Sequence, residues 1–467
     1  MLLYNSKSRK KEEFVPIIPG KISLYACGPT VYNYFHIGNA RAFIFFDVVR
    51  RYFEFKGNEV NYVQNITDID DKIIAQAIEE EIDFKLVADK YSDAFIQDCR
   101  ALGIMPPTHQ PRATDMLNSI IAYIAALVKN NHAYEANGDV YFDTASLASY
   151  GSLSGKKMED QMVGARVADN PNKRNPTDFT LWKKSKPGEP KWDSPWGEGR
   201  PGWHTECVVM SQEFLGETFD IHGGGIDLLF PHHENELAQA TALTGKPLAN
   251  YWMHNGFLNV DGEKMSKSLK NFFTARDILK EHDPETIRFF FLSKHYRSPI
   301  DFNRELIEES GRAVANFYAA LKSVDYLSNT GINVQNEPSN LSKLNDLEAD
   351  FIAAMDDDFN TAKAIAVLFE LSHIARINTA EVDERMAAAT LLVKLGSVLG
   401  FFQNIGQRLA VNTIPIITDE LIQLIISYRK SARENKDWAL SDKIRNDLAK
   451  LGVELKDTPE GCTWSLK

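Results

Sequence analysis

Residues 25–41 read YACGPTVYNYFHIGNAR and predict a strand end, a turn and a helix start. An apolar run at 22–26 precedes the turn, and a helix-like apolar run continues over 42–53. A helix N-terminus offers unpaired N–H groups and a positive dipole end, which attract phosphate. Gly38 admits a ligand close to the backbone, and the ring of His36 can contact phosphate or ribose. The stretch predicts a nucleotide-binding turn; a plain tight turn with a buried cysteine is the alternative.

Length and composition indicate a globular protein with several domains. A chain of 467 residues exceeds one compact core, so we expect two to four domains. No apolar stretch is long enough to cross a membrane, and residues 1–13 do not resemble a secretory signal. Four widely spaced cysteines predict no disulfide framework and fit a reducing cytoplasm. A net charge of -12 disfavours general nucleic-acid coating but permits local basic patches.

The chain then alternates strand-like and helix-like runs. A second strand is expected at 60–64, and the polar cluster at 65–72 after it predicts a ligand-facing position or a helix cap. Helices are expected at 83–102 and 114–130. Residues 156–201 are rich in Lys, Pro, Gly and Trp, which predicts an insertion. Its tryptophans more often cover a small insert than contact nucleic acid; they are Trp182, Trp192 and Trp196.

A candidate metal site comes from four residues of three segments. The α/β pattern returns near residue 203, and a strand at 219–222 leads into three glycines that suit a flat ring or a ribose. On a helix expected to begin near Pro231, His232 and Glu236 share one face. With Cys27 and Cys207 they make a soft N/S/O donor set typical of Zn²⁺. The alternatives are two buried apolar cysteines, or His233 in place of His232.

A lysine-rich loop follows the α/β region. A strand is expected at 257–260 and a tight turn at 261–262, followed by KMSKS at 264–268. Lys264 and Lys267 on such a loop can neutralise charge that builds up on phosphate, although a solvated basic loop is the simpler interpretation. Paired with the HIGN turn at 36–39, the motif becomes specific.

These motifs resemble the class I aminoacyl-tRNA synthetases, and among them the cysteinyl-tRNA synthetase family, over essentially the whole chain. The shared stretches are CGPTVY at 27–32, NITDIDDK at 65–72, GWHTEC at 202–207, FPHHENE at 230–236 and KMSKS. Position 39 is Asn where the superfamily pattern usually has His, a form that the cysteinyl pattern allows. The resemblance implies ATP-dependent ligation of L-cysteine to tRNA(Cys) through a cysteinyl-adenylate, with release of AMP and pyrophosphate.

The resemblance also implies roles for individual residues. The catalytic set is His36, Asn39, Lys264 and Lys267. The ATP-binding set is Gly28, Thr30, His36, Gly38, Asn39 and Lys267, with Mg²⁺ carried on ATP. One Zn²⁺ is held by Cys27, Cys207, His232 and Glu236 and selects the cysteine thiolate. Our candidates for the rest of the amino acid are Thr67, Trp203, His222 and Asp227, although His222 also fits a satisfied strand histidine.

We expect an α/β, Rossmann-like catalytic domain with an insertion, an all-α bundle and a small C-terminal anticodon-binding module. The expected segments are 1–110 and 201–250 for the two catalytic halves, 111–200 for the insertion, 251–310 for the lysine-loop region, 311–405 for the bundle and 410–467 for the module. The module combines Trp438 and Trp464 with six basic residues, which suits unstacked RNA bases, although interleaved acidic residues also fit a solvated helix face.

The expected partners are tRNA(Cys), ATP and L-cysteine, with no membrane, for a cytoplasmic monomer. A ligase that passes cysteine to a small amine is one alternative, and the C-terminal module argues against it. A non-enzymatic zinc-bearing RNA-binding protein is another, and the KMSKS loop and HIGN turn argue against it, because RNA binding requires neither.

Overall fold

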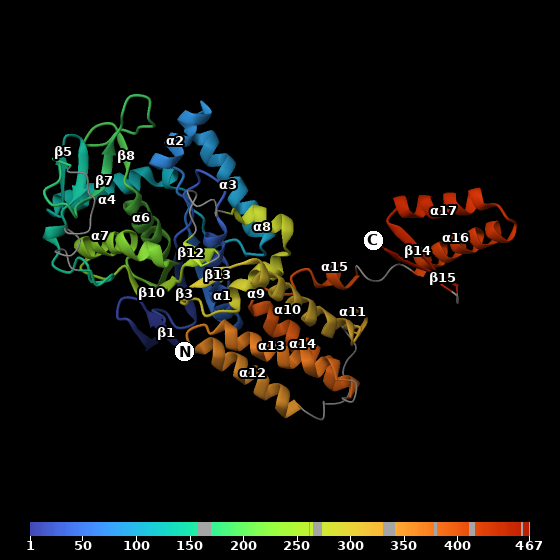
Figure 1. Ribbon diagram of the computed structural model, residues 1–467. Coiled ribbons are helices and arrows are strands. Elements are labelled where there is room, and N and C mark those ends of the chain that lie inside the picture. The colour runs from blue at the N-terminus through green and yellow to red at the C-terminus, as the bar shows by residue number, and fades with distance from the viewer. Residues whose placement is uncertain are drawn as a thin grey trace. The chain divides into compact units, whose positions relative to one another are not determined.

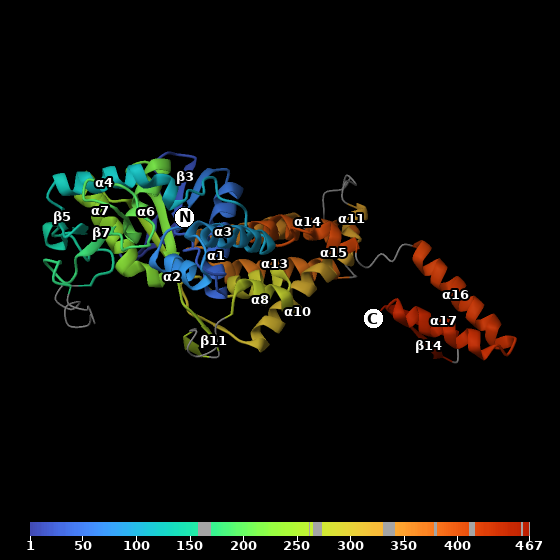
Figure 2. The ribbon, with the colours of Figure 1, turned by 90° about the horizontal axis from the view of Figure 1, so that it is seen from above.

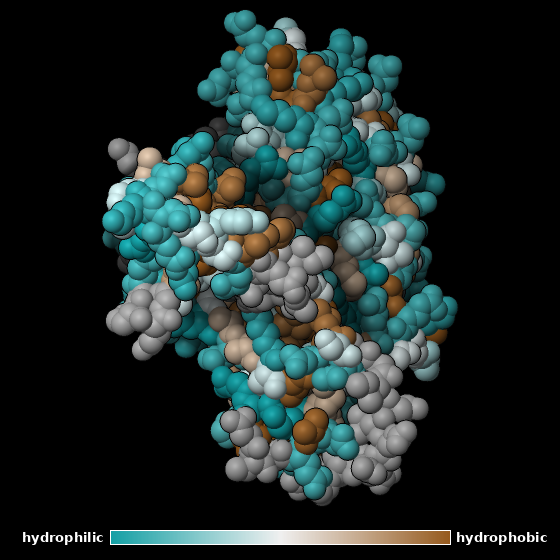
Figure 3. Space-filling model, turned by 90° about the vertical axis from the view of Figure 1, so that its right-hand side faces the viewer, coloured by the Kyte–Doolittle hydropathy of each residue, from teal (hydrophilic) through white to brown (hydrophobic). Residues whose placement is uncertain are grey.

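The computed structural model describes residues 1–156, 170–260, 262–264, 273–329, 341–377, 381–410, 416–458 and 461–466 (Figure 1). The chain forms two compact units, Met1–Gln403 and Asn404–Lys467. Among the described residues no helix is both long and apolar enough to cross a membrane. On the face in Figure 3 hydrophilic side chains predominate, and the hydrophobic patches between them are small.

A four-stranded parallel sheet forms the centre of the first unit. Its order is β10 (Ala249–Asn255), β9 (Phe219–Gly225), β3 (Lys21–Ala26) and β4 (Glu59–Gln64). Because β3 connects onward to β4 on one side while β9 and β10 lie on the other, strand order reverses between β3 and β9. Ligands of open α/β sheets bind at the carboxyl ends of the strands at such a point. The sheet confirms the predicted Rossmann-like α/β class. It also extends through Asn255, so residues 251–255 belong to the central sheet, not to the lysine-loop region in which we expected them.

Helix α1 (Ile37–Phe55) connects β3 to β4 and is buried along most of its length. Twelve of its 19 residues are buried, more than one apolar face would require. The reason is that α1 packs against the sheet on one side and against the α-helical region on the other, where Phe45 and Phe53 contact Phe359. The helix that carries the HIGN turn is therefore held from both sides.

The insertion is a small antiparallel sheet of its own. Its strands are β5 (Ala133–Ala136), β6 (Asp139–Phe142), β7 (Phe179–Lys184) and β8 (Gly199–Pro201), next to helix α4 (Leu117–Lys129), which a single helical turn (Ala113–Met116) precedes. Trp182 is fully buried in the core of this sheet, and Trp192 and Trp196 pack against that core. The three tryptophans cover the insert, as the simpler interpretation predicted.

The remaining elements of the first unit surround these two sheets (Figure 2). Helices α2 (Asp71–Glu80) and α3 (Phe84–Ala101) follow β4, and α6 (Trp203–Leu215) and α7 (Glu234–Thr244) flank β9. A third sheet contains β11 (Leu258–Val260), β12 (Glu263–Lys264) and β13 (Ile300–Phe302), with α8 (Ala275–Glu281) and α9 (Pro284–Leu292) between the last two. A hairpin of β1 (Leu2–Asn5) and β2 (Lys10–Glu13) lies beside β10.

An α-helical bundle completes the first unit. It contains α10 (Arg304–Lys322), α11 (Tyr326–Asn329), α12 (Leu341–Asp356), α13 (Thr361–Arg376) and α14 (Val382–Val398). Helix α10 begins seven residues before the expected start of the bundle at 311, because the side chain of Asn303 accepts a hydrogen bond from the Leu306 amide and caps the helix there.

The second unit contains three helices and a hairpin. These are α15 (Ile405–Ala410), α16 (Ile416–Glu434), α17 (Trp438–Lys450), β14 (Val453–Thr458) and β15 (Gly461–Leu466). Its core is small and gathers around Ile422, Leu448 and Val453, with Trp464 packed against them.

A buried ion pair joins helix α1 to helix α9. Asp47 of α1 accepts hydrogen bonds from Arg51 Nε and Arg288 Nη1, both at 2.8 Å, and Asp47 and Arg288 are each 1% exposed. Arg288 also donates to the carbonyls of Gly103 and Leu399, at 2.9 and 3.2 Å. One guanidinium thus links α9, α1 and the end of the bundle.

We expect Asp47→Asn to lower the free energy of unfolding by about 3–5 kcal/mol, because it leaves two guanidinium groups short of a buried counter-charge. The exposed pair of Asp89 and Arg112 provides the control, and Asp89→Asn should change that free energy by less than about 1 kcal/mol. Urea unfolding of both variants measures the difference. Equal losses in the two would contradict a structural role for the buried pair.

Candidate active site

A cavity of about 370 Å³ opens at the carboxyl ends of β3 and β9. Most residues of the 27–39 stretch line it, including every residue predicted there for ATP: Gly28, Thr30, His36, Gly38 and Asn39. Trp203, Asp227 and residues 255–258 line the rest, together with Lys72. The predicted nucleotide-binding turn therefore faces a cavity.

The turn is held against the chain that follows β4. A Cβ at Gly28 would come within 1.7 Å of the Asn65 carbonyl oxygen, so only glycine fits there. The Gly28 amide donates to Asn65 Oδ1 at 2.8 Å, and the Val31 amide donates to the Thr67 carbonyl at 3.1 Å. The polar cluster at 65–72 thus supports the turn with its first residues and reaches the cavity with its last, Lys72.

His36 caps helix α1 and faces the cavity as a neutral ring. Its Nδ1 accepts a hydrogen bond from the Asn39 amide at 3.2 Å, which places the remaining ring proton on Nε2. Desolvation of this half-buried ring lowers the pKa of His36 to about 4; the carboxylate of Asp227 opposes that shift and the charge of Lys72 adds to it. At neutral pH His36 is a hydrogen-bond donor beside a positive helix end.

The chain around the lysine motif is attached to this turn. Lys264 pairs with Asn259 in the β11–β12 ladder; its side chain, and the whole of Lys267, lie outside the described residues. Where the description resumes, the Phe273 carbonyl accepts from the Ile37 amide, and the Ala275 amide donates to the Phe35 carbonyl, both at 3.0 Å. Residues 273–275, which follow the lysine motif in the chain, therefore contact the HIGN turn at the start of α1.

The four predicted metal ligands converge. One ligand atom from each of Cys27, Cys207, His232 and Glu236 lies within 4.8 Å of all the others, and all four residues are buried. The two sulfurs are 4.0 Å apart, Cys207 Sγ is 3.5 Å from His232 Nε2, and Cys27 Sγ is 3.7 Å from Glu236 Oε1. A tetrahedral zinc site with ordinary bond lengths has S···S and S···N edges of about 3.8 and 3.6 Å. The donor set and its spacing fit Zn²⁺.

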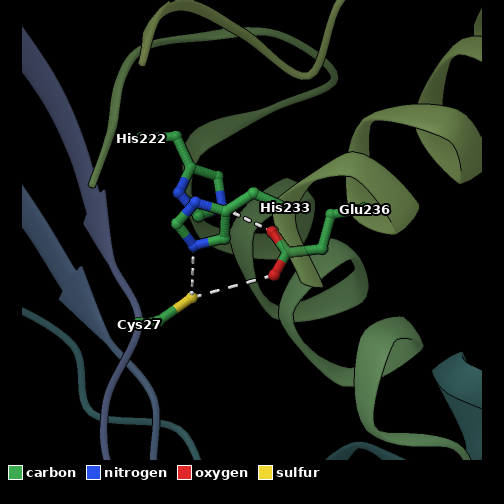
Figure 4. Close-up of side chains that lie close together, drawn as sticks. All are labelled: Cys27, His222, His233 and Glu236. Carbon is green, nitrogen blue, oxygen red and sulfur yellow. Dashed lines mark hydrogen bonds and ion pairs between the residues drawn. The ribbon is translucent and has the colours of Figure 1, made fainter. Parts of the chain in front are cut away.

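A second group of histidines surrounds the same cluster (Figure 4). His233 Nε2 lies 3.3 Å from Cys27 Sγ, and its Nδ1 lies 2.8 Å from His254 Nε2. His222 Nε2 is hydrogen-bonded to Glu236 Oε2 at 2.5 Å, and His204 Nδ1 lies 2.9 Å from His232 Nδ1. Each carboxylate or imidazole ligand of the proposed set thus has an outer partner, as metal ligands usually have. His233 remains an alternative ligand, because it too reaches Cys27.

Electrostatics favour negative charge in this buried cluster. Burial raises the pKa of the Cys27 thiol, and the hydrogen bond from that thiol lowers the pKa of Cys207 to about 6. Burial opposes ionisation of Glu236, but the charges of His222 and His232 hold its pKa well below the ordinary value. A thiolate and a carboxylate in one buried site are what a divalent cation requires of its ligands.

Several local expectations were wrong. Helix α7 begins at Glu234 rather than near Pro231, because Phe230 has extended backbone angles (φ -144°, ψ 132°) and a separate turn, Leu229–His233, precedes the helix. The first two glycines of the run at 223–225 do not leave an open backbone surface against which a ring or a ribose could lie. A Cβ at Gly223 would come within 2.1 Å of the Phe46 ring, and one at Gly224 within 2.9 Å of His233.

The four candidates for the amino-acid pocket divide into two pairs. Trp203 and Asp227 line the cavity, and the Trp203 ring stacks on His232 with centroids 4.0 Å apart. Thr67 and His222 do not line it: Thr67 is 1% exposed and donates to Glu206 at 3.0 Å, and His222 is fully buried behind Glu236. Both are buried and hydrogen-bonded to glutamates inside the protein, Thr67 through its hydroxyl and His222 through Nε2, so a direct substrate contact is not supported for either.

Sequence reasoning missed residues 255–258 as part of the cavity wall, and it predicted a ligand-facing cluster at 65–72 without singling out Lys72. Lys72 ends the polar cluster at 65–72, so its position after a strand was the available signal. Residues 255–258 follow β10 in the same way, but they carry no charged side chain that would mark them.

Comparison with known proteins identifies the family. Residues 13–312 match the family model for the "tRNA synthetases class I (C) catalytic domain", and residues 350–403 match the "DALR domain". A cysteine–tRNA ligase of Pelobacter propionicus is 47% identical, and the match covers 100% of this chain and 99% of that protein. The chain belongs to the cysteine–tRNA ligases, a class I aminoacyl-tRNA synthetase family.

Solved structures of other class I synthetases share the fold of this cysteine–tRNA ligase family member. An Agrobacterium radiobacter leucyl enzyme, solved with tRNA, has a TM-score of 0.63 at 11% identity, covering 85% of this chain and 86% of that one. A Mycobacterium tuberculosis methionyl-tRNA synthetase has a TM-score of 0.59 at 13% identity, covering 81% and 91%. The DALR match falls on the bundle, to which sequence reasoning had assigned no function.

We expect the purified protein to bind one zinc ion, and Cys207→Ser to lose most of it, because serine replaces a thiolate ligand with a poorer oxygen donor. Cys99, which lies outside the cluster, provides the matched control, and Cys99→Ser should keep full metal content. Elemental analysis of dialysed protein measures both. Equal zinc in the two variants would show that Cys207 is not a ligand.

We expect the His36 ring to stay neutral down to a pH near 4, since desolvation disfavours its charged form. NMR titration of histidine-labelled protein measures this, with the His36 signal assigned by its absence in His36→Gln. An unperturbed surface histidine titrates at about 6.5, so a midpoint there would contradict the neutral-donor interpretation.

Proposed function

We propose that this chain ligates L-cysteine to tRNA(Cys) at the expense of ATP, through a cysteinyl-adenylate, with release of pyrophosphate and then AMP. One observation carries the proposal: Cys27 lines the cavity and also belongs to the buried Cys/His/Glu cluster. The same short stretch therefore presents a nucleotide-binding turn and a thiol-binding metal site to one cavity.

Two bonds are exchanged in sequence. The cysteine carboxylate oxygen bonds to the α-phosphorus of ATP as the bond to the β-phosphate bridging oxygen breaks. A ribose hydroxyl at the tRNA 3′ end then bonds to the cysteinyl carbonyl carbon as AMP leaves. Neither step requires a protein nucleophile, so positioning and charge stabilisation account for the acceleration.

The residues of the turn would bind the phosphates. The neutral His36 donates from Nε2, and the start of α1 adds the positive end of the helix dipole, with Asn39 beside it. Gly28, Thr30 and Gly38 line the cavity without bulky side chains in the way of the nucleotide. We assign Lys264 and Lys267 to the departing pyrophosphate. Mg²⁺ would arrive with ATP, held largely by phosphate oxygens.

The metal ligands would provide selectivity against serine. Zn²⁺ held by Cys27, Cys207, His232 and Glu236 would bind the substrate sulfur as a thiolate. Trp203 and Asp227, which line the cavity beside the cluster, would bound the rest of the amino acid. An apolar pocket alone separates such close analogues by only about 1–3 kcal/mol.

We assign tRNA binding to the two C-terminal regions. The DALR match supports such a role for the bundle, and exposed Lys430, Lys436 and Trp438 support it for residues 410–467. Arg429 and Trp464 are unsuited to RNA contact, because Arg429 is buried against Asp457 and Trp464 packs into the small core. We further propose a cytoplasmic monomer, since buried thiolate ligands favour a reducing compartment.

We expect cysteine-dependent ATP–pyrophosphate exchange followed by transfer to tRNA(Cys), with serine disfavoured by more than about 200-fold, the most that an apolar pocket achieves. Protein stripped of metal should fall below that ratio. No exchange would defeat both enzyme functions, and exchange without transfer would favour the small-amine ligase. Undiminished rejection of serine by metal-free protein would refute the selective role of zinc.

A further inference from the structure

Arg41, two residues after the HIGN turn, is a buried cation with no carboxylate partner among the described residues. It is 2% exposed, and in the described part of the chain its acceptors are all backbone carbonyls. Nη1 donates to Gly256 and Phe257 at 2.7 and 2.9 Å. Nη2 donates to Ser298 at 2.6 Å, Tyr296 at 3.1 Å and His295 at 3.4 Å.

These acceptors belong to two segments that cross closely. Residues 255–258 run from β10 to β11 and line the cavity, whereas 295–298 lead into β13. A Cβ at Gly256 would come within 2.6 Å of the Arg297 carbonyl oxygen, so the two backbones touch. Converging carbonyls repel one another, and a planar cation among them removes that repulsion.

The second segment is anchored from its other side as well. Arg297 Nε and the Tyr296 hydroxyl both donate to Asp358, each at 2.8 Å, and Asp358 is fully buried. Asp358 lies in the turn between α12 and α13, which also packs on α1 through Phe359. The 295–298 segment is therefore a fixed support for the cavity wall.

Burial lowers the pKa of Arg41 to about 10, so the side chain stays charged at neutral pH. A lysine at this position would keep the charge, but it has a single nitrogen with three donors. It cannot reproduce the hydrogen bonds that the two arms of the Arg41 guanidinium make to carbonyl groups of both segments.

We propose that Arg41 is a positioning residue for ATP. Its side chain holds the cavity wall at Gly256 and Phe257 at a fixed distance from the helix end that carries His36 and Asn39. The proposal rests on the proposed function, in which ATP occupies this cavity. Since β11 leads directly from Phe257 towards Lys264, the same contact fixes the HIGN turn relative to the strand before the lysine motif.

The test compares Arg41→Lys with Arg288→Lys in the full-length protein. Arg288 of α9 is an equally buried arginine that also donates to backbone carbonyls, but its carbonyls belong to Gly103 and Leu399, which do not line the cavity. Calorimetry measures Mg-ATP binding without cysteine, and exchange assays give KM for cysteine. We expect both variants to lose thermal stability. Arg41→Lys alone should weaken ATP binding, on the order of 10–100-fold, with KM for cysteine and zinc content unchanged.

A second variant covers the case in which Arg41→Lys does not fold. Gly256→Ala leaves Arg41 intact but pushes the same wall away from Arg297, and it should weaken ATP binding similarly. Unchanged ATP affinity in a folded Arg41→Lys or Gly256→Ala protein would overturn the proposal, as would equal weakening in Arg288→Lys. Because binding is measured without cysteine, a wild-type protein that binds ATP yet shows no cysteine-dependent exchange would refute the proposed function separately.

Discussion

Parallel pairing of β3 with β9 is the constraint on which both the cavity and the cysteine cluster depend. Ala26 lies opposite Gly223, and the Cys27 amide donates to the Gly223 carbonyl at 3.1 Å. Strands that run parallel end at the same edge, so Cys27 meets the turn and helix that follow β9. A one-residue slip would turn Cys27 to the other face of the sheet. Gly223 permits this register, because only a residue without Cβ leaves room for Phe46 of α1.

Sequence patterns were sufficient for the strands of this sheet and for the chemistry of the cluster. Apolar runs ending in small or polar residues predicted β3, β4 and β9, and the soft donor types of the cluster pointed to one metal. The patterns did not show how deeply each polar side chain is buried in the protein. Thr67 and His222 were expected in the pocket, but their partners, Glu206 and Glu236, come from helices far along the chain. A polar side chain after a strand has the same sequence signal whether it faces ligand or protein.

Arg41 shows a further limit of sequence reasoning. Its partners are backbone carbonyls, which every residue has, so no pattern of side chains in the sequence marks it. The buried carboxylates Asp47 and Asp358 differ, because each has an arginine partner at 2.8 Å, Arg288 and Arg297. The first pair joins α1, which lines the cavity, to α9, and the second joins segment 295–298, which supports the cavity wall, to the turn between α12 and α13. Buried charges at such junctions fix the geometry of the fold. They do not add stability, since apolar contacts at the same places would stabilise the fold equally well.

The second unit depends on one polar contact, because its apolar core is small. Its apolar cluster gathers around Ile422, Leu448 and Val453, and a unit of this size buries too little surface to be secure by apolar packing alone. Arg429 joins α16 to β14 through a two-armed pair with Asp457, at 2.8 and 3.0 Å, and Arg433 adds a third contact at 3.1 Å. The two arginines fix the position of the Asp457 carboxylate and lower its pKa. The exposed lysines and Trp438 take no part in this core, so they are the side chains that remain available for the proposed contact with RNA.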